Sequence, residues 1–218
     1  MGASGGCVIA RPPDPELESM STVFLNGEYM PKAEATISPD DRGFLLGDGL
    51  YEVTPFYEGV PFGFEGHLQR LMRGLCWLRI DYDTSGLEAM HRELIARNGL
   101  DTAERSMVYM QVTRGVAPRT HYFPEGDVTP TIYAYAKEWS RPSDEAWNRG
   151  FTAKTVPDRR WSRVDIKTVC LLPNALAFQD AKEAGADDAI LVRDGVAIEG
   201  AHQNFGGVFG GTVVTHPG

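Results

Sequence analysis

The 218-residue sequence is 42% hydrophobic and 23% charged, which leaves room to bury a core in one large or two small domains. Its formal net charge of −9, without any cluster of Lys and Arg, argues against a nucleic-acid partner. No apolar stretch approaches the roughly 18 residues of a membrane-spanning helix, and the amino-terminal layout of a signal peptide is missing.

The first elements are expected to be two β-hairpins. A Gly- and Pro-rich segment, residues 1–20, is interpreted as a disordered tail before a more natural start at Met20. The Asn26-Gly27 pair in TVFLNGEYM lies between short apolar segments and predicts the first hairpin. The second is expected from a strand at Tyr51–Tyr57 and a turn at Glu58-Gly59, with the return strand at a sheet edge because it contains Pro61.

Two helices and two strands should complete the first half. The first helix is predicted in EGHLQRLMRGLCWLRI, because five apolar residues recur there at three- and four-residue spacing: Leu68, Leu71, Met72, Leu75 and Leu78. The second should be capped by Thr84 or Ser85 and end at Asn98-Gly99. SMVYMQVTRG and TIYAYAKEW are predicted strands, so the first half is an α+β layer.

The second half is expected to be a separate, β-rich unit. The predicted domains are residues 21–140 and 151–218, joined by a linker at 141–150. Strands are expected in GFTAKTVP, DDAILVRDG and GTVVTH, and a helix from Pro173 to Ala184 that ends at Gly185. The last strand has no evident partner, so this domain is expected to be incomplete.

The cysteines indicate a reducing environment. Cys7, Cys76 and Cys170 are odd in number, far apart and never in a CxxC pair, which argues against a disulfide framework and a structural zinc site. We therefore expect a cytoplasmic protein without a metal.

Three basic or acidic positions could carry chemistry. Lys167, in RVDIKTVCLL, precedes an apolar helix, and a lysine buried at a strand-to-helix junction could act as a nucleophilic amine. The alternative is a lysine with its stem on apolar surface and its head in water. Glu199 ends GVAIEG and could pair with a buried cation or be an exposed turn residue. Arg70 flanks the apolar stripe and could bind phosphate or simply lie at the surface.

Arg119 and His121 lie in TRGVAPRTHYFPEGD, a Gly- and Pro-punctuated loop that follows a strand. In an extended backbone, two residues separated by one position point the same way and could converge on one carboxylate. The alternative is a solvated loop without a ligand.

Taken in order, these motifs resemble a known family. The succession DRGFLLGDGLYEV, HLQRL, QVTRGVAPRTHYFPE, DIKTVCLLPNALAFQDA, IEGAHQN and THP is similar to the class IV pyridoxal-phosphate aminotransferases. The Arg-Thr-His element resembles D-amino acid aminotransferases, of the D-alanine type, more than branched-chain aminotransferases. The resemblance runs from about Thr22 to Pro217 and implies fold type IV: a small α/β domain followed by a β-rich pseudo-barrel domain, truncated at its carboxyl end.

The resemblance implies a role for each candidate residue. Lys167 would hold pyridoxal 5'-phosphate covalently and move protons, and Glu199 would pair with the pyridine nitrogen. Arg70 would bind the phosphate, and Arg160 would lie near the phenolic oxygen. The substrate α-carboxylate would be bound by Tyr51 together with Arg119 and His121 of a neighbouring subunit, so a homodimer is implied. The expected reaction exchanges an amino group between a D-amino acid and a 2-oxo acid, such as D-alanine and 2-oxoglutarate.

The sequence departs from the family in two places, and other readings stay open. His202 and Gln203 stand where the family has small hydroxyl residues, and the phosphate-binding turn that follows THP in the family is missing, so Arg70 would act alone. The alternatives are an aminodeoxychorismate lyase-type enzyme, a branched-chain aminotransferase-type enzyme or an inactive fragment. The Arg119 and His121 pair argues against the lyase, because that enzyme handles an aromatic substrate.

Overall fold

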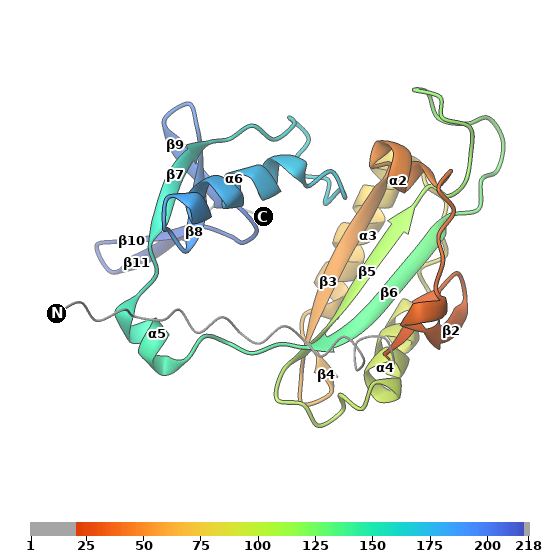
Figure 1. The fold of residues 1–218 in the computed structure, drawn as a ribbon, viewed down its shortest axis with the longest axis horizontal. Helices are drawn as coiled ribbons and strands as arrows, with labels where there is room; N and C mark the ends of the chain where they lie inside the picture. The colour runs from red at the N-terminus through yellow and green to blue at the C-terminus, as the bar shows by residue number, and fades with distance from the viewer. Residues whose placement is uncertain (1–20, 216–218) are drawn as a thin grey trace.

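The computed structural model describes residues 21–215 and shows two groups of elements (Figure 1). The expected tail up to Met20, with Cys7, lies outside the described residues. We call residues 21–139 the first lobe and residues 151–215 the second lobe. Among the described residues, no sheet contains strands from both lobes. The strands of the first lobe form one six-stranded sheet, and those of the second form a three-stranded sheet and a hairpin. The division into domains remains a prediction.

The first lobe opens with the predicted Asn26-Gly27 hairpin. Both turn residues have positive φ, 50° and 99°, which is the backbone of the two-residue turn that Asn-Gly favours. The elements of the first lobe are, in chain order, β1 (Thr22–Leu25), β2 (Glu28–Pro31), η1 (Lys32–Glu34), α2 (Arg42–Leu46), β3 (Gly49–Tyr57), β4 (Val60–Pro61), α3 (Phe64–Leu78), α4 (Leu87–Arg97), β5 (Ser106–Thr113) and β6 (Thr131–Glu138). The sheet is antiparallel throughout, with the order β2-β1-β6-β5-β3-β4. The predicted return strand β4, with Pro61, is therefore an edge strand.

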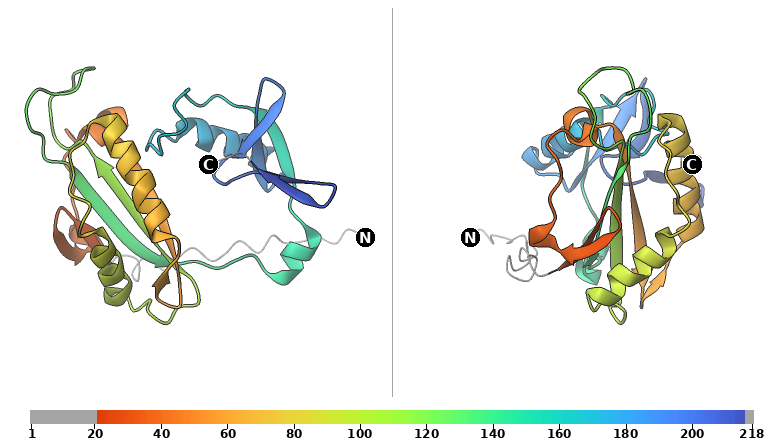
Figure 2. Two further views of the ribbon diagram at one scale, coloured as in Figure 1. Left: turned by 180° about the vertical axis from the view of Figure 1, so that it is seen from behind. Right: turned by 90° about the vertical axis from the view of Figure 1, so that its right-hand side faces the viewer.

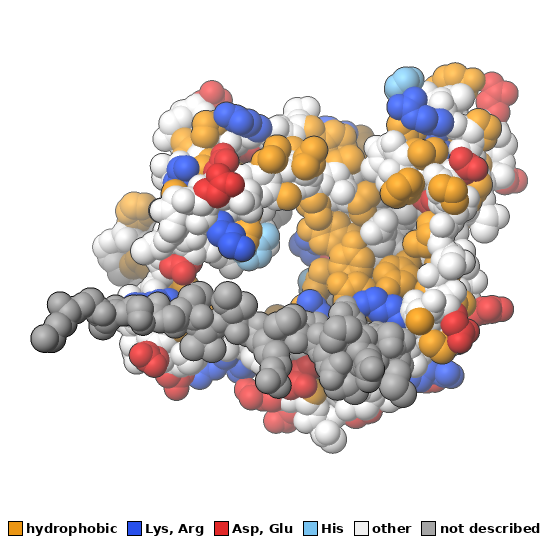
Figure 3. Space-filling view, viewed as in Figure 1, with side chains coloured by type: hydrophobic (Ala, Val, Ile, Leu, Met, Phe, Trp, Pro, Cys, Tyr) orange, Lys and Arg blue, Asp and Glu red, His pale blue; other side chains and the backbone are white. Residues whose placement is uncertain are grey.

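One face of this sheet carries the core. Helices α3 and α4 both cover the same face, as the edge-on view in Figure 2 shows. Residues at alternate positions on β3, β5 and β6, including Phe56 and Met110, point toward these helices and are buried with helix residues such as Leu94 of α4. The opposite face is only half-buried and carries four tyrosines: Tyr51, Tyr109, Tyr133 and Tyr135. Figure 3 shows hydrophobic side chains gathered there, beside the hollow between the lobes.

Two details of the helices differ from the prediction. Met72 of α3 is exposed, because it lies at the edge of the apolar stripe whose centre is formed by the buried Leu71 and Leu75. Helix α4 is not capped by Thr84 or Ser85. Its N-cap is Gly86, and the Ser85 hydroxyl and backbone amide bond instead to Asp83. The predicted stop at Asn98-Gly99 is confirmed, since the Asn98 amide donates to the Leu94 carbonyl.

The second lobe is smaller and follows a short helix in the predicted linker. Its elements, with that helix first, are α5 (Asp144–Arg149), β7 (Ala153–Pro157), α6 (Leu172–Glu183), β8 (Asp188–Arg193), β9 (Val196–Gly200), β10 (Gly206–Phe209) and β11 (Thr212–Thr215). Strands β7 and β8 are parallel and are connected through α6, whereas β8 and β9 form a hairpin. The expectation that the last strand lacks a partner is wrong. Strand β11 pairs with β10, because Gly210 and Gly211 take the positive φ of a tight turn.

The segment between β7 and α6 joins the lobes. It crosses to the start of β3, where the Tyr51 amide donates to the Lys167 carbonyl at 3.0 Å and the Val169 amide donates to the Gly49 carbonyl at 3.2 Å. The buried Thr168 bridges to Leu50 and donates its hydroxyl to the Gly49 carbonyl. The segment 158–171 of the second lobe is thus fixed against the first sheet before the chain enters α6. Among residues 21–215, no helix is both long and apolar enough to cross a membrane.

Candidate active site

A cavity of about 510 Å³ lies where the start of β3, segment 158–171, α6 and the end of β9 meet. Its volume is in the range of sites that bind small ligands. All the predicted cofactor residues and one predicted substrate residue line it: Tyr51, Arg70, Arg160, Lys167 and Glu199. These residues are far apart in the sequence and come from both lobes. The cavity therefore brings together most of the predicted site.

The backbone of Lys167 is fixed by β3, as described above, but its surroundings differ from the expectation. Lys167 is half-buried in an irregular segment, not fully buried at a strand-to-helix junction, because the chain crosses to the first sheet between β7 and α6. Its Nζ lies over the Tyr51 ring, 4.1 Å from the centroid. Among residues 21–215, no carboxylate forms an ion pair with it. The amine is thus held in the cavity by an aromatic ring and is available to react with a carbonyl group.

Glu199 and Arg160 belong to a network centred on Asp158. The fully buried Asp158 carboxylate accepts from Arg160 at 3.1 Å and from Arg193 at 2.8 Å, and Arg160 Nη1 also donates to Glu199 Oε2. Burial by itself raises the pKa of Asp158, but the hydrogen bonds and charges of these arginines outweigh it and hold the pKa below its usual value. Arg160 is therefore fixed between two carboxylates. Oε1 of Glu199 has no hydrogen bond to the part of the chain that the structure describes.

Arg70 is oriented by a buried acid that the sequence reasoning missed. The side chain of Glu52, only 2% exposed, accepts from Arg70 Nε at 2.6 Å and Nη2 at 2.8 Å, and it also contacts His67 Nδ1 at 3.0 Å. Burial raises the pKa of Glu52, but the hydrogen bonds from Arg70 and His67 reverse the shift and hold this pKa below its usual value. This fork engages two guanidinium nitrogens of Arg70. Nη1 has no hydrogen-bond partner among the described residues.

Arg119 and His121 lie outside the cavity of their own chain. Both are exposed on the loop between β5 and β6, which projects from the first lobe beyond α2 (Figure 1). The backbone around Arg119 is not fully extended. The Thr120 amide donates to the Pro118 carbonyl at 2.8 Å, so the chain turns tightly around Arg119. Their role in binding a carboxylate, from a neighbouring subunit, remains a prediction.

The unusual residues after Glu199 form one wall of the cavity. His202, Gln203 and Asn204 all line it. The His202 ring packs edge-on against Phe178 of α6, with 5.1 Å between ring centroids, and Gln203 donates to Asp188. Asn174 of α6 donates to the Ala201 carbonyl at 2.7 Å. Helix α6 and this turn are thus joined directly beside Glu199.

Sequence signals for the missed residues are uneven. Glu52 could have been found, because strand alternation places it on the same face as Leu50 and Phe56, and a buried acid there needs a cation from the facing helix. Asp158 and Asn174 carry no such signal. Their importance comes from contacts with Arg193 and Ala201, which only the tertiary structure brings near.

Comparisons with known proteins identify the family of this chain. Residues 49–217 match the family model "Amino-transferase class IV". The chain is 40% identical over 200 residues to the D-alanine aminotransferase of Staphylococcus haemolyticus, covering 91% of this chain and 70% of that protein. It is 37% identical over 197 residues to the D-alanine aminotransferase of Bacillus licheniformis, covering 89% and 68%.

Solved structures share the fold at lower identity. The branched-chain aminotransferase of Thermoproteus uzoniensis, solved with norvaline, aligns with a TM-score of 0.79 at 21% identity over 90% of this chain and 68% of that chain. A hypothetical aminotransferase from Mycobacterium tuberculosis, solved with alpha-ketoglutarate and PMP bound, aligns with a TM-score of 0.75 at 22% identity, covering 90% and 71%. The predicted α+β class and fold type IV are confirmed. The chain belongs to the class IV aminotransferase family.

Proposed function

We propose that this protein transfers the amino group between a D-amino acid and a 2-oxo acid, using pyridoxal phosphate held by Lys167. The observation that carries the proposal is that Lys167, Glu199 and Arg70 line the same cavity. The choice of D-amino acids is supported by the curated relatives, which are D-alanine aminotransferases at about 40% identity. The branched-chain enzyme, at 21% identity, is similar in fold alone.

The residues of the cavity fit pyridoxal phosphate. The cofactor needs an amine for its aldehyde, an acid for its ring nitrogen and a cation for its phosphate. The described residues offer the Lys167 amine without an acidic partner, Oε1 of Glu199 without a hydrogen bond, and Nη1 of Arg70 likewise. Lys167 would hold the aldehyde carbon, Glu199 the ring nitrogen, Arg70 the phosphate and Arg160 the phenolic side of the ring.

The protein's own contribution to the reaction is proton transfer and orientation. When bound, pyridoxal phosphate supplies an electron sink for the charge that develops at the substrate α-carbon. Lys167 Nζ would remove the α-hydrogen of the amino acid as a proton. In the second half of the reaction it would deliver a proton to the carbon of the 2-oxo acid that becomes the new α-carbon. Because Tyr51 lies against this amine and is fixed to the Lys167 backbone, it limits where Nζ can move.

Glu199 would keep a proton at the ring nitrogen. Arg160 donates to one oxygen of Glu199 and is anchored at its other end by Asp158, so the carboxylate is oriented by a charge-assisted bond. Glu199→Gln should keep the cofactor bound but slow turnover, since a neutral amide no longer favours the protonated ring. Unchanged turnover of D-alanine in this variant would remove Glu199 from the mechanism.

Substrate binding would use a second copy of the chain. Arg119 and His121 are exposed and lie outside the cavity of their own chain, so they can serve a carboxylate only at a neighbouring subunit's site. We therefore propose a symmetric dimer, the commonest closed assembly. Sedimentation should show a dimer at working concentration. A monomer with full activity would contradict this part of the proposal.

A cytoplasmic location also belongs to the proposal. Cys76 and Cys170 are both exposed free thiols, which suits a reducing compartment. Fractionation of cells that express the protein would test the location directly.

The cofactor site can be tested by chemical trapping. After incubation with pyridoxal phosphate and reduction with borohydride, peptide mapping should find the modified lysine at Lys167. Lys167→Ala should lose this labelling and all transamination of D-alanine. Lys182→Ala, on the exposed surface of the neighbouring helix α6, is the matched control and should keep both. Labelling that persists mainly at another lysine in Lys167→Ala would refute the assignment.

A further inference from the structure

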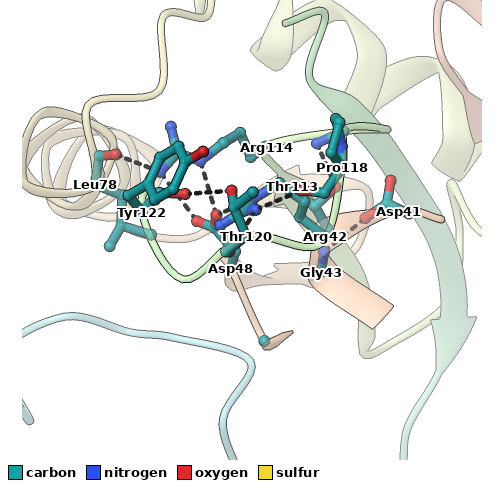
Figure 4. Close-up of polar contacts among 12 residues, drawn as sticks. Asp41, Arg42, Gly43, Asp48, Leu78, Thr113, Arg114, Pro118, Thr120 and Tyr122 are labelled. Atoms are coloured by element: carbon teal, nitrogen blue, oxygen red, sulfur yellow. Dashed lines mark hydrogen bonds and ion pairs between the residues drawn. The ribbon is translucent and has the colours of Figure 1, made fainter. Parts of the chain in front are cut away.

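A buried cluster of charges lies at the end of the first sheet where β3 begins (Figure 4), and its side chains are not among the residues that line the cavity. Asp48, which precedes β3, accepts from Arg42 Nε at 2.9 Å and from Arg114 Nε and Nη2 at 2.7 and 3.0 Å. The three side chains are only 2–7% exposed. One carboxylate thus meets two guanidinium groups away from water, which leaves one positive charge to be satisfied by other groups.

Backbone carbonyls supply the remaining partners. Arg42 Nη1 donates to the carbonyls of Pro118 and Thr120, at 3.1 and 3.0 Å. Arg114 donates to the carbonyls of Leu78 and Arg79 at the end of α3, at 2.7 and 3.2 Å. Because a buried guanidinium without acceptors is costly, the loop and the helix end cannot move away without leaving charged donors unsatisfied.

The two carbonyls that Arg42 binds are those on either side of Arg119. Figure 4 shows Arg42 reaching this stretch of the loop, and His121 is the next residue in the chain after Thr120. The Thr120 hydroxyl also fixes the loop backbone, because it donates to the Tyr122 carbonyl at 2.9 Å. The side chain of Arg42 therefore fixes the backbone from which both predicted carboxylate-binding residues project.

The two ends of the loop and its far side are also held in place. The Arg42 amide donates to the Gly115 carbonyl at 2.9 Å. A Cβ at Gly115, whose φ is +94°, would lie only 2.0 Å from the Thr129 carbonyl oxygen, so the two ends of the loop are in close contact. On the far side, the Arg114 guanidinium stacks 3.8 Å from the centroid of the Phe123 ring. The loop is thus held at its base, at Arg119 and at Phe123.

We propose that Arg42 is a positioning residue for substrate recognition, which holds the 116–123 loop so that Arg119 and His121 present their side chains to an α-carboxylate. Asp48 acts as the shared counter-ion that keeps Arg42 in place. This inference rests on the proposed function, because it assumes that Arg119 binds the substrate carboxylate. Arg42 itself is buried, so it acts only through the loop.

The test is a double-mutant cycle with a second, structural readout. Arg42→Met keeps the length of the side chain but removes the fork, and Arg42→Lys keeps the charge beside Asp48 without the planar fork. In Arg42→Met we expect the Michaelis constant for D-alanine to rise roughly tenfold with kcat little changed, and amide exchange in residues 116–123 to become at least about tenfold faster. Arg42→Lys should show smaller changes of the same kind, and it covers the case in which Arg42→Met does not fold.

The decisive comparison is made in the Arg119→Ala background. If Arg42 acts through Arg119 and His121, replacing Arg42 there should raise the Michaelis constant clearly less than it does in the wild type, because only His121 is left to be displaced. Arg105→Met, at the opposite end of the sheet beside Trp139, is the matched control and should change neither readout. An equal rise in both backgrounds, or unchanged loop exchange in both Arg42 variants, would overturn the proposal. Absence of D-alanine turnover in the wild type would instead refute the proposed function, and the exchange data would still report on the loop.

Discussion

The two lobes are stabilised in different ways. The first lobe buries a large cluster of aliphatic and aromatic side chains between its six-stranded sheet and two helices. The buried apolar cluster of the second lobe consists of Val156, Leu191 and four alanines: Ala177, Ala181, Ala189 and Ala201. Small side chains bury little apolar area, so hydrophobic stabilisation per residue is lower in the second lobe.

The difference matters because the candidate active site draws on both lobes. Tyr51 and Arg70 stand on the well-packed first lobe, whereas Arg160 and Glu199 stand on the second, where the Asp158 network replaces much of the apolar packing. Desolvated ion pairs give less net stability than apolar burial, although they fix geometry. We infer that the second lobe has the lower local stability and that cofactor binding raises it through linkage.

The largest contrast is expected from matched leucine deletions. Leu94 in α4 and Leu191 in β8 are both fully buried, at 0% and 1% exposure. Leu94→Ala removes a side chain surrounded by other large side chains and should cost about 4–5 kcal/mol, whereas Leu191→Ala among alanines should cost about 2–3 kcal/mol. Urea unfolding followed by peptide-resolved hydrogen exchange would assign each loss to its lobe. Equal losses of unfolding free energy in the two variants would contradict the expected difference between the lobes.

Acid should weaken the first lobe through His91. This histidine is buried and donates Nδ1–H to the Leu87 carbonyl, and burial lowers its pKa to about 4. As the pH falls from about 6.5 to 4, the unfolded chain takes up a proton that the folded chain does not, so the unfolding free energy should fall by about 3 kcal/mol. His91→Gln should lose this pH dependence. The only histidine of the described second lobe, His202, is 62% exposed. A wild-type stability that is flat over this range would contradict the assignment.

Loss of the Arg119 guanidinium should affect binding rather than stability. Arg119→Ala removes a charge-assisted contact worth about 1.5–3 kcal/mol, so the Michaelis constant for D-amino acids should rise roughly ten- to a hundredfold. Arg119→Lys should recover only part of this loss, because a point charge cannot supply the bidentate fork. Steady-state kinetics measures the effect, and thermal melting should show no change since Arg119 is exposed. An unchanged Michaelis constant would remove Arg119 from substrate binding.

The smallest effect is expected in the β10–β11 hairpin. Val213 is 73% exposed, whereas Val108 in β5 is fully buried. The isosteric change Val108→Thr should cost about 1–3 kcal/mol by burying a hydroxyl, and Val213→Thr should stay within about 0.5 kcal/mol. Denaturant midpoints would show the difference. A large loss for Val213→Thr would mean that the hairpin is part of a packed core.

The predictability of the two lobes from sequence also differs. In the first lobe, the Asn26-Gly27 turn and the three- and four-residue spacing of apolar residues in α3 are local signals, and they predicted the first hairpin and this helix correctly. The caps at Thr84 and Ser85 failed because Asp83 competes for the same groups. Around the site, the proposed roles of Lys167 and Glu199 rest on the family motifs, since their own neighbours in the chain say little. The partners Asp158 and Arg42 depend on contacts between distant segments, which no local pattern encodes.

The central claim is that Lys167 serves D-amino acid transamination, and one measurement tests it most directly. Purified wild type and Lys167→Ala, each supplied with pyridoxal phosphate and 2-oxoglutarate, are given D-alanine or L-alanine, and the initial rate of pyruvate formation is followed. A carboxylate held on one side and an amine held at the cofactor leave one face of the α-carbon toward Lys167, so only one enantiomer should react. The account predicts pyruvate from D-alanine with the wild type alone; equal rates with both enantiomers, or retained activity in Lys167→Ala, would contradict it.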